Sequence, residues 1–435
     1  MKRDDHRILR TAVCALIALC TASAAALTAN AAGTTKDEPP KVYFKEISLG
    51  GYHGMAVAEN GSLYTWGDNS SGQLGTGDKT DRDEPIKIMS HARQISAGIK
   101  TSSAIKENGE LFVWGEKGNL GYSAENESNL IPQRLRSNIS SVIMGSEGGA
   151  FISNQHELFQ WKTGIPERIS GNVDYVSVRR NHHYCGSGFV NGKGELYVYG
   201  SDNFYGSLGT GKQNHYTTIE EPTKILDNVV VVSMGGQHSA AVTTDGNLYT
   251  WGRNDYGQLG DGTHQDTYEP HKVEALNQVK SVSVGQYHTA AITVNGDLYV
   301  WGADNAYQLG DGYQVDQPLP IKLMENVKQV SIWNDKTLAL TEDGRMFIWG
   351  TSSLMWNFSQ PTPQEIEVFL YKLLGDCDGD DNITSDDALA VLRLSIGLET
   401  IDDDDERTFP VSDYDKDDEL TSNDAMLILR VSVGY

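Results

Sequence analysis

Two short acidic segments near the C-terminus carry the residues best suited to chemistry. They read DCDGDDNITSDD over residues 376–387 and DYDKDDELTSND over residues 413–424. Each places oxygen-bearing side chains at loop positions 1, 3, 5, 9 and 12, and position 7 would offer its backbone carbonyl. Hard oxygen donors at this spacing surround a hard cation such as Ca²⁺. We therefore predict two bound calcium ions, with the ligands Asp376, Asp378, Asp380, Asn382, Thr384 and Asp387 in the first loop and Asp413, Asp415, Asp417, Glu419, Thr421 and Asp424 in the second.

An apolar segment follows each acidic loop and predicts the helix that positions it. The segments cover residues 388–397 and 425–433, whereas no comparable helix clearly precedes either loop. Two EF-hand-like loop–helix copies with Asp rather than Glu at position 12 resemble the type I dockerin family, over residues 375–435. A disordered acidic tail is the alternative, and the two apolar segments argue against it.

The dockerin resemblance implies a partner and a location for the chain. Dockerins bind the cohesin domains of a scaffoldin and so join a cellulosome. The near-symmetry of the two copies implies two docking poses related by a half-turn. Asp381 and Asp418 stand where the family usually has glycine, which leaves the calcium affinity open. The cohesin contacts implied by the resemblance are Ser385, Asp386, Arg393, Ser422, Asn423 and Arg430.

Most of the chain upstream repeats a unit of about fifty residues. One copy reads VSVGQYHTAAITVNGDLYVWGADNAYQLGDG over residues 282–312. Its Asn295-Gly296 pair predicts a tight turn, because those residues adopt positive φ at little cost. The following Leu298–Trp301 segment is typical of a strand buried on both faces. A fourth strand follows each polar loop with the pattern Pro-x-x-aliphatic, so each repeat predicts a four-stranded propeller blade.

The number of blades follows from the aromatic residue that ends the third strand of each repeat. We predict an all-β, seven-bladed β-propeller over residues 41–366, followed by a small all-α, calcium-binding dockerin. The motif L-Y-x-W-G-x-N-x-x-G-Q-L-G resembles the repeat of the regulator of chromosome condensation family. Repeat 2 shortens the loop after this strand, repeat 3 (WKTGIPERI) lacks it, and repeat 7 replaces it with TSSLMWNF. The seven aromatic residues are Trp66, Trp114, Trp161, Tyr199, Trp251, Trp301 and Trp349.

The N-terminal 31 residues resemble a secretory signal. Basic residues precede an alanine-rich apolar stretch, and Ala29-Asn30-Ala31 fits a cleavage site of the small-x-small type. A membrane anchor is the alternative, but the apolar core over 12–20 is too short to span a bilayer. We expect a secreted, extracellular protein with no membrane insertion, held at the cell surface through a cellulosome.

Charge and residue repetition exclude some functions. The net charge of −24 argues against binding nucleic acid. His53, His238 and His288 recur at one position of the repeat, which favours a structural hydrogen bond to neighbouring backbone over a metal ring or a catalytic array. Lys100 and Lys336 are expected to replace this histidine in repeats 2 and 7.

The polar loops after Leu-Gly differ most between repeats, and such loops gather on one face of a propeller. Tyr216, Tyr268 and Tyr313 make this face aromatic, as protein-binding surfaces often are. The sequence contains neither G-x-S-x-G nor H-E-x-x-H. We expect a non-catalytic propeller that binds a still unknown protein. An enzyme acting on plant polysaccharide and a carbohydrate-binding module are the alternatives.

Overall fold

The computed structural model describes residues 41–122, 129–179, 186–203, 205–211, 214–352 and 358–368. The predicted signal segment, both calcium loops and the cohesin-contacting residues therefore lie outside the described residues. Side chains at 201–203, 214–217, 352 and 358 also lie outside the description.

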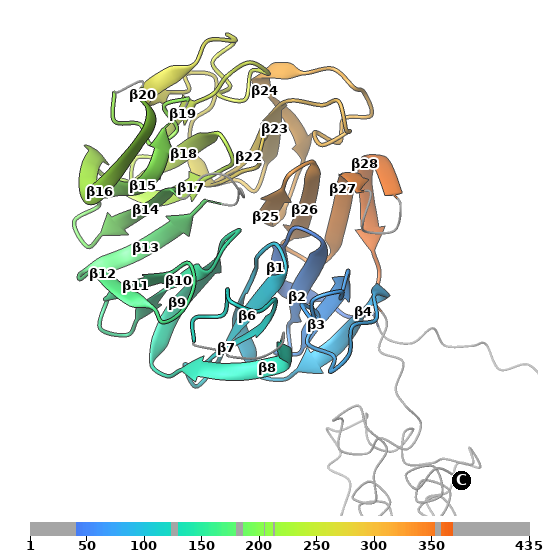
Figure 1. Cartoon of the computed structure of the whole chain (residues 1–435). Helices are drawn as coiled ribbons and strands as arrows, with labels where there is room; N and C mark the ends of the chain where they lie inside the picture. Colours follow the sequence, from blue (N-terminus) through green and yellow to red (C-terminus); the bar gives the residue numbers. More distant parts are fainter. Residues whose placement is uncertain are drawn as a thin grey trace, which may run out of the picture. The chain divides into compact units, whose positions relative to one another are not determined.

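The described residues form seven four-stranded antiparallel sheets around a central axis, as the repeats predict (Figure 1). Within every sheet the strands follow one another in sequence order, so each blade is one contiguous stretch of chain. Blades 1 to 4 consist of β1 (Phe44–Leu49), β2 (His53–Ala58), β3 (Leu63–Gly67), β4 (Arg82–Met89); β5 (Ala92–Ala97), β6 (Thr101–Lys106), β7 (Leu111–Gly115), β8 (Asn129–Arg136); β9 (Ile139–Met144), β10 (Gly149–Ser153), β11 (Leu158–Trp161), β12 (Glu167–Ser170); β13 (Val173–Val178), β14 (Gly186–Asn191), β15 (Leu196–Asn203) and β16 (Asn214–Leu226). Blades 5 to 7 consist of β17 (Val229–Met234), β18 (His238–Thr243), β19 (Leu248–Gly252), β20 (Thr267–Lys272); β21 (Val279–Val284), β22 (His288–Thr293), β23 (Leu298–Gly302), β24 (Gln317–Met324); β25 (Val327–Trp333), β26 (Lys336–Thr341), β27 (Met346–Ser352) and β28 (Phe358–Ile366).

The predicted turn between the second and third strands is confirmed. Gly296, between β22 and β23, has φ = 82°, a backbone conformation that residues other than glycine rarely adopt. The third strand is also buried as predicted, since Leu298, Val300 and Trp301 are each 0% exposed. Alternate residues of the pleated strand thus face both neighbouring blades.

The ring closes by contact between blades 1 and 7, without a shared strand. In Figure 1, β1 lies beside β25 and β26. The amide of Leu49 donates to Ser331 Oγ at 2.9 Å, and the amide of Ile47 donates to Gln329 Oε1 at 3.0 Å. The equivalent serine Ser96 links blades 2 and 3 in the same way. The Val-Ser-Val pattern of the first strand therefore supplies both core side chains and links between blades.

A short turn from one blade packs against the aromatic residue of the next blade. Between blades 5 and 6, the Gln258 carbonyl accepts bonds from Thr289 Oγ1 and Trp301 Nε1, both at 2.9 Å. The following Leu259 is 1% exposed. We call such polar–Leu–Gly segments interblade turns, and in the described residues they occupy 73–75, 119–121, 207–209, 258–260 and 308–310. Blade 3 lacks one, because its chain passes directly from Trp161 to β12.

Candidate binding face

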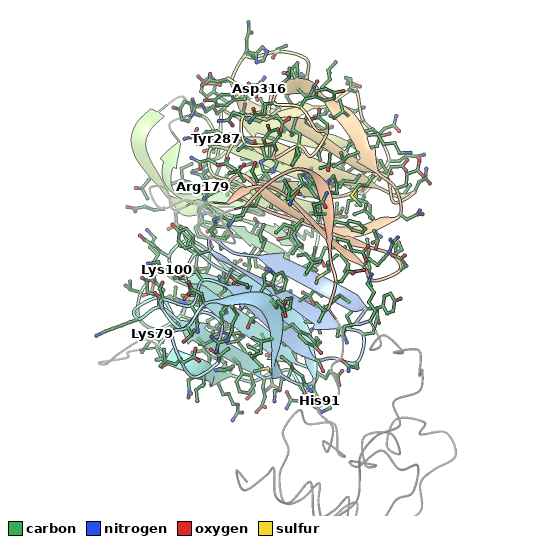
Figure 2. All side chains as sticks on the ribbon, turned by 90° about the vertical axis from the view of Figure 1, so that its right-hand side faces the viewer. Lys79, His91, Lys100, Arg179, Tyr287 and Asp316 are labelled. Carbon is green, nitrogen blue, oxygen red and sulfur yellow. The ribbon has the colours of Figure 1, made fainter. Side chains whose placement is uncertain are left out.

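Two sets of connections open on one side of the ring. In an antiparallel meander, the turn after the first strand and the loop after the third strand lie at the same end of the sheet. Figure 2 shows Lys79, Lys100, Arg179, Tyr287 and Asp316 toward one side of the propeller; these residues come from such connections in blades 1, 2, 4 and 6. We call this side the loop face.

The blade 5 loop is held rigid by one asparagine. The amide of Asn254 donates to Asp266 Oδ1 at 2.7 Å, and its side-chain Oδ1 accepts from the Leu259 amide at 3.0 Å. Its Nδ2 group donates to Asp261 Oδ1 at 3.2 Å and to the Thr263 carbonyl at 3.1 Å. A single buried side chain thus fixes both ends of the loop, so the loop is preorganised for binding.

Blade 6 has Asp304 in the place of this asparagine. Asp304 is fully buried, its amide donates to Asp316 Oδ1 at 2.8 Å, and its Oδ1 accepts from the Leu309 amide at 2.9 Å. Among the described residues, Asp304 Oδ2 has no hydrogen-bond partner. Burial raises the pKa of Asp304 to about 7, and the nearby charge of Asp311 adds to the rise. Ionised Asp304 has no donor with which to replace the amide bonds made by asparagine.

An arginine lies among three tyrosines on the loop face. The Arg253 guanidinium carbon is 4.7 Å from the ring centroid of Tyr205, 5.6 Å from that of Tyr256 and 5.5 Å from that of Tyr287. Tyr256 and Tyr287 contact each other edge to face at 5.2 Å. The four residues, which we call the arginine–tyrosine cluster, come from blades 4, 5 and 6 and join them by cation–π contacts.

Hydrogen bonds fix the orientation of the cluster. Arg253 Nη2 lies 2.6 Å from Asp255 Oδ2, and Arg253 also donates to the side chain of Gln237. The Arg253 side chain is only 17% exposed. Tyr205 and Tyr256 therefore have a packing role within this cluster.

The three tyrosines predicted to form the binding face have different environments. Tyr313 is 69% exposed in the blade 6 loop. Tyr268 is half-buried in β20 and packs over Gly206, where an added Cβ would lie 2.4 Å from its ring. The side chain of Tyr216 lies outside the described residues. The described structure therefore leaves Tyr313 as the one clearly projecting member of this set.

Exposed apolar residues that sequence reasoning missed adjoin Tyr313. Val315 is 60% exposed, and Leu319 of β24 is 47% exposed. The sequence QVDQPLP over 314–320, in which apolar and polar residues alternate, could have predicted these exposed side chains. Exposed apolar residues that lie close together along one segment, here a loop and the strand that follows it, are typical of interaction sites.

The repeated histidines are structural, but they bond to a side chain rather than to backbone. His238 Nε2 lies 2.7 Å from Thr289 Oγ1 of the next blade, and that hydroxyl donates to the Gln258 carbonyl. The hydroxyl oxygen must then accept the hydrogen of Nε2, which fixes the tautomer. Burial lowers the pKa of His238 to about 3, so the ring is neutral. His53 and His288 make equivalent bonds to Ser102 Oγ and Thr337 Oγ1.

Of the two lysines predicted at the histidine position, Lys100 is wrong and Lys336 is confirmed. The register places Thr101 opposite Gly115, as His53 lies opposite Gly67, so Thr101 and not Lys100 takes this position in blade 2. The turn has two glycines in blade 1 and one in blade 2. Matching Gly98 to Gly51 gives Lys100, but Gly98 corresponds to Gly50, since the amide of each donates to the carbonyl three residues later. Lys336 does occupy the position in blade 7, where Nζ donates to the Gly51 carbonyl at 2.9 Å. Burial lowers the pKa of Lys336 to about 8.

The described residues contain no group of three or more His, Cys, Asp or Glu side chains that could hold a metal ion. In the same part of the chain, no helix is long and apolar enough to cross a bilayer. The calcium ligands and cohesin contacts predicted between Asp376 and Arg430 remain predictions, since all lie outside the described residues.

A family model described as RCC1-like domain matches residues 21–332. Among curated relatives, Ultraviolet-B receptor UVR8 of Arabidopsis thaliana is 30% identical over 258 residues, which are 52% of this chain and 57% of UVR8. E3 ubiquitin-protein ligase HERC2 of Homo sapiens is 30% identical over 271 residues, which are 54% of this chain and 5% of HERC2. The matched region is therefore less than two thirds of either relative.

Two solved structures show the same fold. Prp20p from Saccharomyces cerevisiae superimposes with a TM-score of 0.58 at 22% identity, over 66% of this chain and 80% of Prp20p. Human WBSCR16 gives a TM-score of 0.60 at 19% identity, over 70% of this chain and 93% of that protein. At such identities the likeness establishes the propeller architecture alone.

Proposed function

The chain belongs to the family of RCC1-like domains, and on that premise we propose that its propeller is a protein-binding module rather than an enzyme. The supporting observation is the loop face of blade 6, where the segment after β23 presents exposed Tyr313, Val315 and Leu319. Aromatic and apolar side chains on a rigid support carry much of the energy of protein association. Catalysis instead needs unlike groups that converge on one point. The repeated histidines are buried and bonded between blades, so they do not offer such a centre.

The second part of the proposal is that the C-terminal region anchors the propeller outside the cell. Its two acidic loops would bind two calcium ions and present Ser385, Asp386, Ser422 and Asn423 to a cohesin domain. Without calcium, like charges at Asp376, Asp378 and Asp380 and their second-loop counterparts repel one another. Calcium is therefore expected to be required for folding of this region, and the protein would act within a cellulosome at the cell surface.

The propeller role is tested with full-length protein captured on a surface and exposed to culture supernatant, followed by identification and purification of the retained protein. Substituting both Tyr313→Ala and Val315→Ala should weaken binding of that purified protein about tenfold or more. The matched control is Val294→Ala, since Val294 is 59% exposed but lies after β22, at the opposite end of its blade. Equal binding by the parent chain, the double variant and the Val294→Ala variant would refute the proposal. Release of sugar from xylan or cellulose by the purified chain would also refute it.

The anchor is tested by binding of the full chain to an immobilised cohesin domain. We expect binding in calcium that a chelator abolishes. Changing Ser385 and Asp386 alone should leave binding nearly intact, because Ser422 and Asn423 substitute for them, whereas changing both pairs should abolish it. Binding that persists in chelator would contradict the calcium requirement.

A further inference from the structure

The interface between blades 3 and 4 differs from its neighbours because blade 3 has no interblade turn. Only five residues separate Trp161 from β12, which begins at Glu167, whereas the blade 5 loop runs from Gly252 to Thr267. The space between the two blades is an open groove with a cavity volume of about 590 Å³. Its lining includes Gln160, Trp161, Ile169, Ser187, Tyr199 and Thr218.

The groove keeps the hydroxyl donors that receive an interblade turn elsewhere. In blade 4, Ser187 pairs with Tyr199 across β14 and β15, as Thr289 pairs with Trp301 in blade 6. Thr289 and Trp301 both donate to a carbonyl of the preceding blade's turn. Ser187 is 2% exposed, and burial raises the pKa of Tyr199, so both hydroxyl groups remain protonated donors.

A side chain from blade 3 takes the place of the missing carbonyl. Gln160 Nε2 donates to Ser187 Oγ at 2.9 Å, and Gln160 Oε1 accepts a hydrogen bond from the Tyr199 hydroxyl. The equivalent residue in blade 5, Thr250, instead bonds to the carbonyl of Leu259 in its own loop. A glutamine amide can rotate away from these hydroxyl groups, whereas the backbone of a loop cannot. The hydrogen-bonding position of the turn is therefore occupied by a group that an incoming ligand can displace.

The interfaces that contain an interblade turn show which kind of segment would fit in the groove. Each of their turns has a carbonyl acceptor, then a leucine that is at most 1% exposed, then a glycine with positive φ. Glycine is required because an added Cβ at Gly260 would lie 2.7 Å from Trp301 Nε1. In the groove, Ile169 and the Tyr199 ring, which both pack against the core between blades 3 and 4, offer apolar walls for such a leucine. The groove lies at the interface between blades 3 and 4, since its lining combines Gln160 and Ile169 of blade 3 with Ser187 and Tyr199 of blade 4.

We propose that this groove binds a Leu-Gly turn of a partner protein, in the place of the turn that blade 3 lacks. The leucine packs on Ile169 and the Tyr199 ring, and the preceding carbonyl accepts from Ser187 and the Tyr199 hydroxyl once Gln160 moves aside. This site involves blades 3 and 4, whereas Tyr313 belongs to blade 6. The proposal is therefore independent of the role of Tyr313, and each site is tested by its own variants.

The test uses the full chain and a fluorescently labelled peptide with the sequence of residues 305–313, NAYQLGDGY. The matched control peptide carries Asp at the Leu309 position. Fluorescence anisotropy should show binding of the first peptide and at least tenfold weaker binding of the second. Blocking the groove with Thr218→Trp should weaken binding by a similar factor, since Thr218 is exposed and lines the groove.

Controls separate the proposal from misfolding and from other ligands. Thr223→Trp places the same bulk on an exposed site of the same strand, β16, away from the groove lining, and should bind as the parent does. Tyr313→Ala should also bind unchanged, which distinguishes this site from the loop face. Equal binding by the Thr218→Trp and Thr223→Trp variants, or by both peptides, overturns the proposal. Binding of cellohexaose that Thr218→Trp abolishes assigns the groove to a polysaccharide and likewise overturns it.

Discussion

The interface between blades 5 and 6 and the interface between blades 3 and 4 are formed by equivalent strands. They differ in the groups that lie between those strands. In the first, Leu259 fills the space, His238 bonds to Thr289, and the Gln258 carbonyl receives two donors. In the second, the register puts Gly148 at the histidine position, and no interblade turn is present. The sheets nevertheless hold their places. The strand core alone is thus sufficient to position a blade.

This comparison separates the contribution of the inner strands to an interface from the contribution of the interblade turn. Inner strands supply packing and, where the Val-Ser-Val serine is present, hydrogen bonds between blades, as between blades 4 and 5, where Ser177 Oγ accepts from the Met234 amide at 2.9 Å. Blade 3 has Ile143 at this position, so its interface with blade 4 keeps the packing without this bond. The outer half of the interface depends on the interblade turn, and there the loss opens a groove. A repeat protein can therefore gain a cavity by deleting a loop while its neighbours supply stability.

The largest effect is expected from removing the leucine of an interblade turn. Leu259→Ala deletes a buried side chain between blades 5 and 6 and should cost about 3 kcal/mol in the free energy of unfolding. The matched change in the open groove is Ile165→Ala, where the side chain is 68% exposed and the cost should stay within about 0.5 kcal/mol. Chemical unfolding followed by tryptophan fluorescence measures both. Similar costs for the two variants would show that the turn does not support the interface.

A smaller effect is expected from acid at the histidine-bearing interfaces. Burial lowers the pKa of His288 to about 3, against 6.5 in the unfolded chain. Stability from this group is therefore present above pH 6.5 and is lost as the pH falls toward 3. At pH 5 the loss is about 2 kcal/mol for each such histidine.

The test compares unfolding at pH 7 and pH 5. His288→Asn should lower stability at pH 7 but reduce the difference between the two pH values. His264→Asn is the control, because His264 is exposed and should leave the pH dependence unchanged. An unchanged pH dependence in the His288 variant would mean that its ring is not held neutral.

The smallest effect is expected at the interface without a turn. Gln160→Ala removes the partner of Ser187 and Tyr199 and should cost about 1 kcal/mol, since water in the groove can replace the lost bonds. Adding Tyr199→Phe to this variant should cost little more, because the two groups act as a pair. Gln133→Ala, on the exposed surface of β8, is the control. A full additive cost in the double variant would contradict the pairing of Gln160 with Tyr199.

Local sequence predicted much of the fold because each blade is closed by contacts within one repeat. The turn at Asn295-Gly296 and the buried strand ending at Trp301 are local patterns, and both are confirmed. The histidine position in blade 2 was wrong because its turn has one glycine where blade 1 has two, and strand register shows that Gly98 corresponds to Gly50, which identifies Thr101. The binding face was predicted only in part, since Tyr268 packs over a neighbouring blade whereas Tyr313 projects.

The sequence by itself determined the number of blades, their four strands and the absence of a loop after Trp161, because these depend on patterns within about fifty residues. Only the tertiary structure decided how that absence is accommodated. Tyr199 and Gln160 are 39 residues apart, and Leu49 and Ser331, which close the ring, are 282 apart. Such pairs meet only once the blades pack side by side. Their hydrogen bonds, and the groove beside Gln160, are therefore properties of the assembled ring rather than of any single repeat.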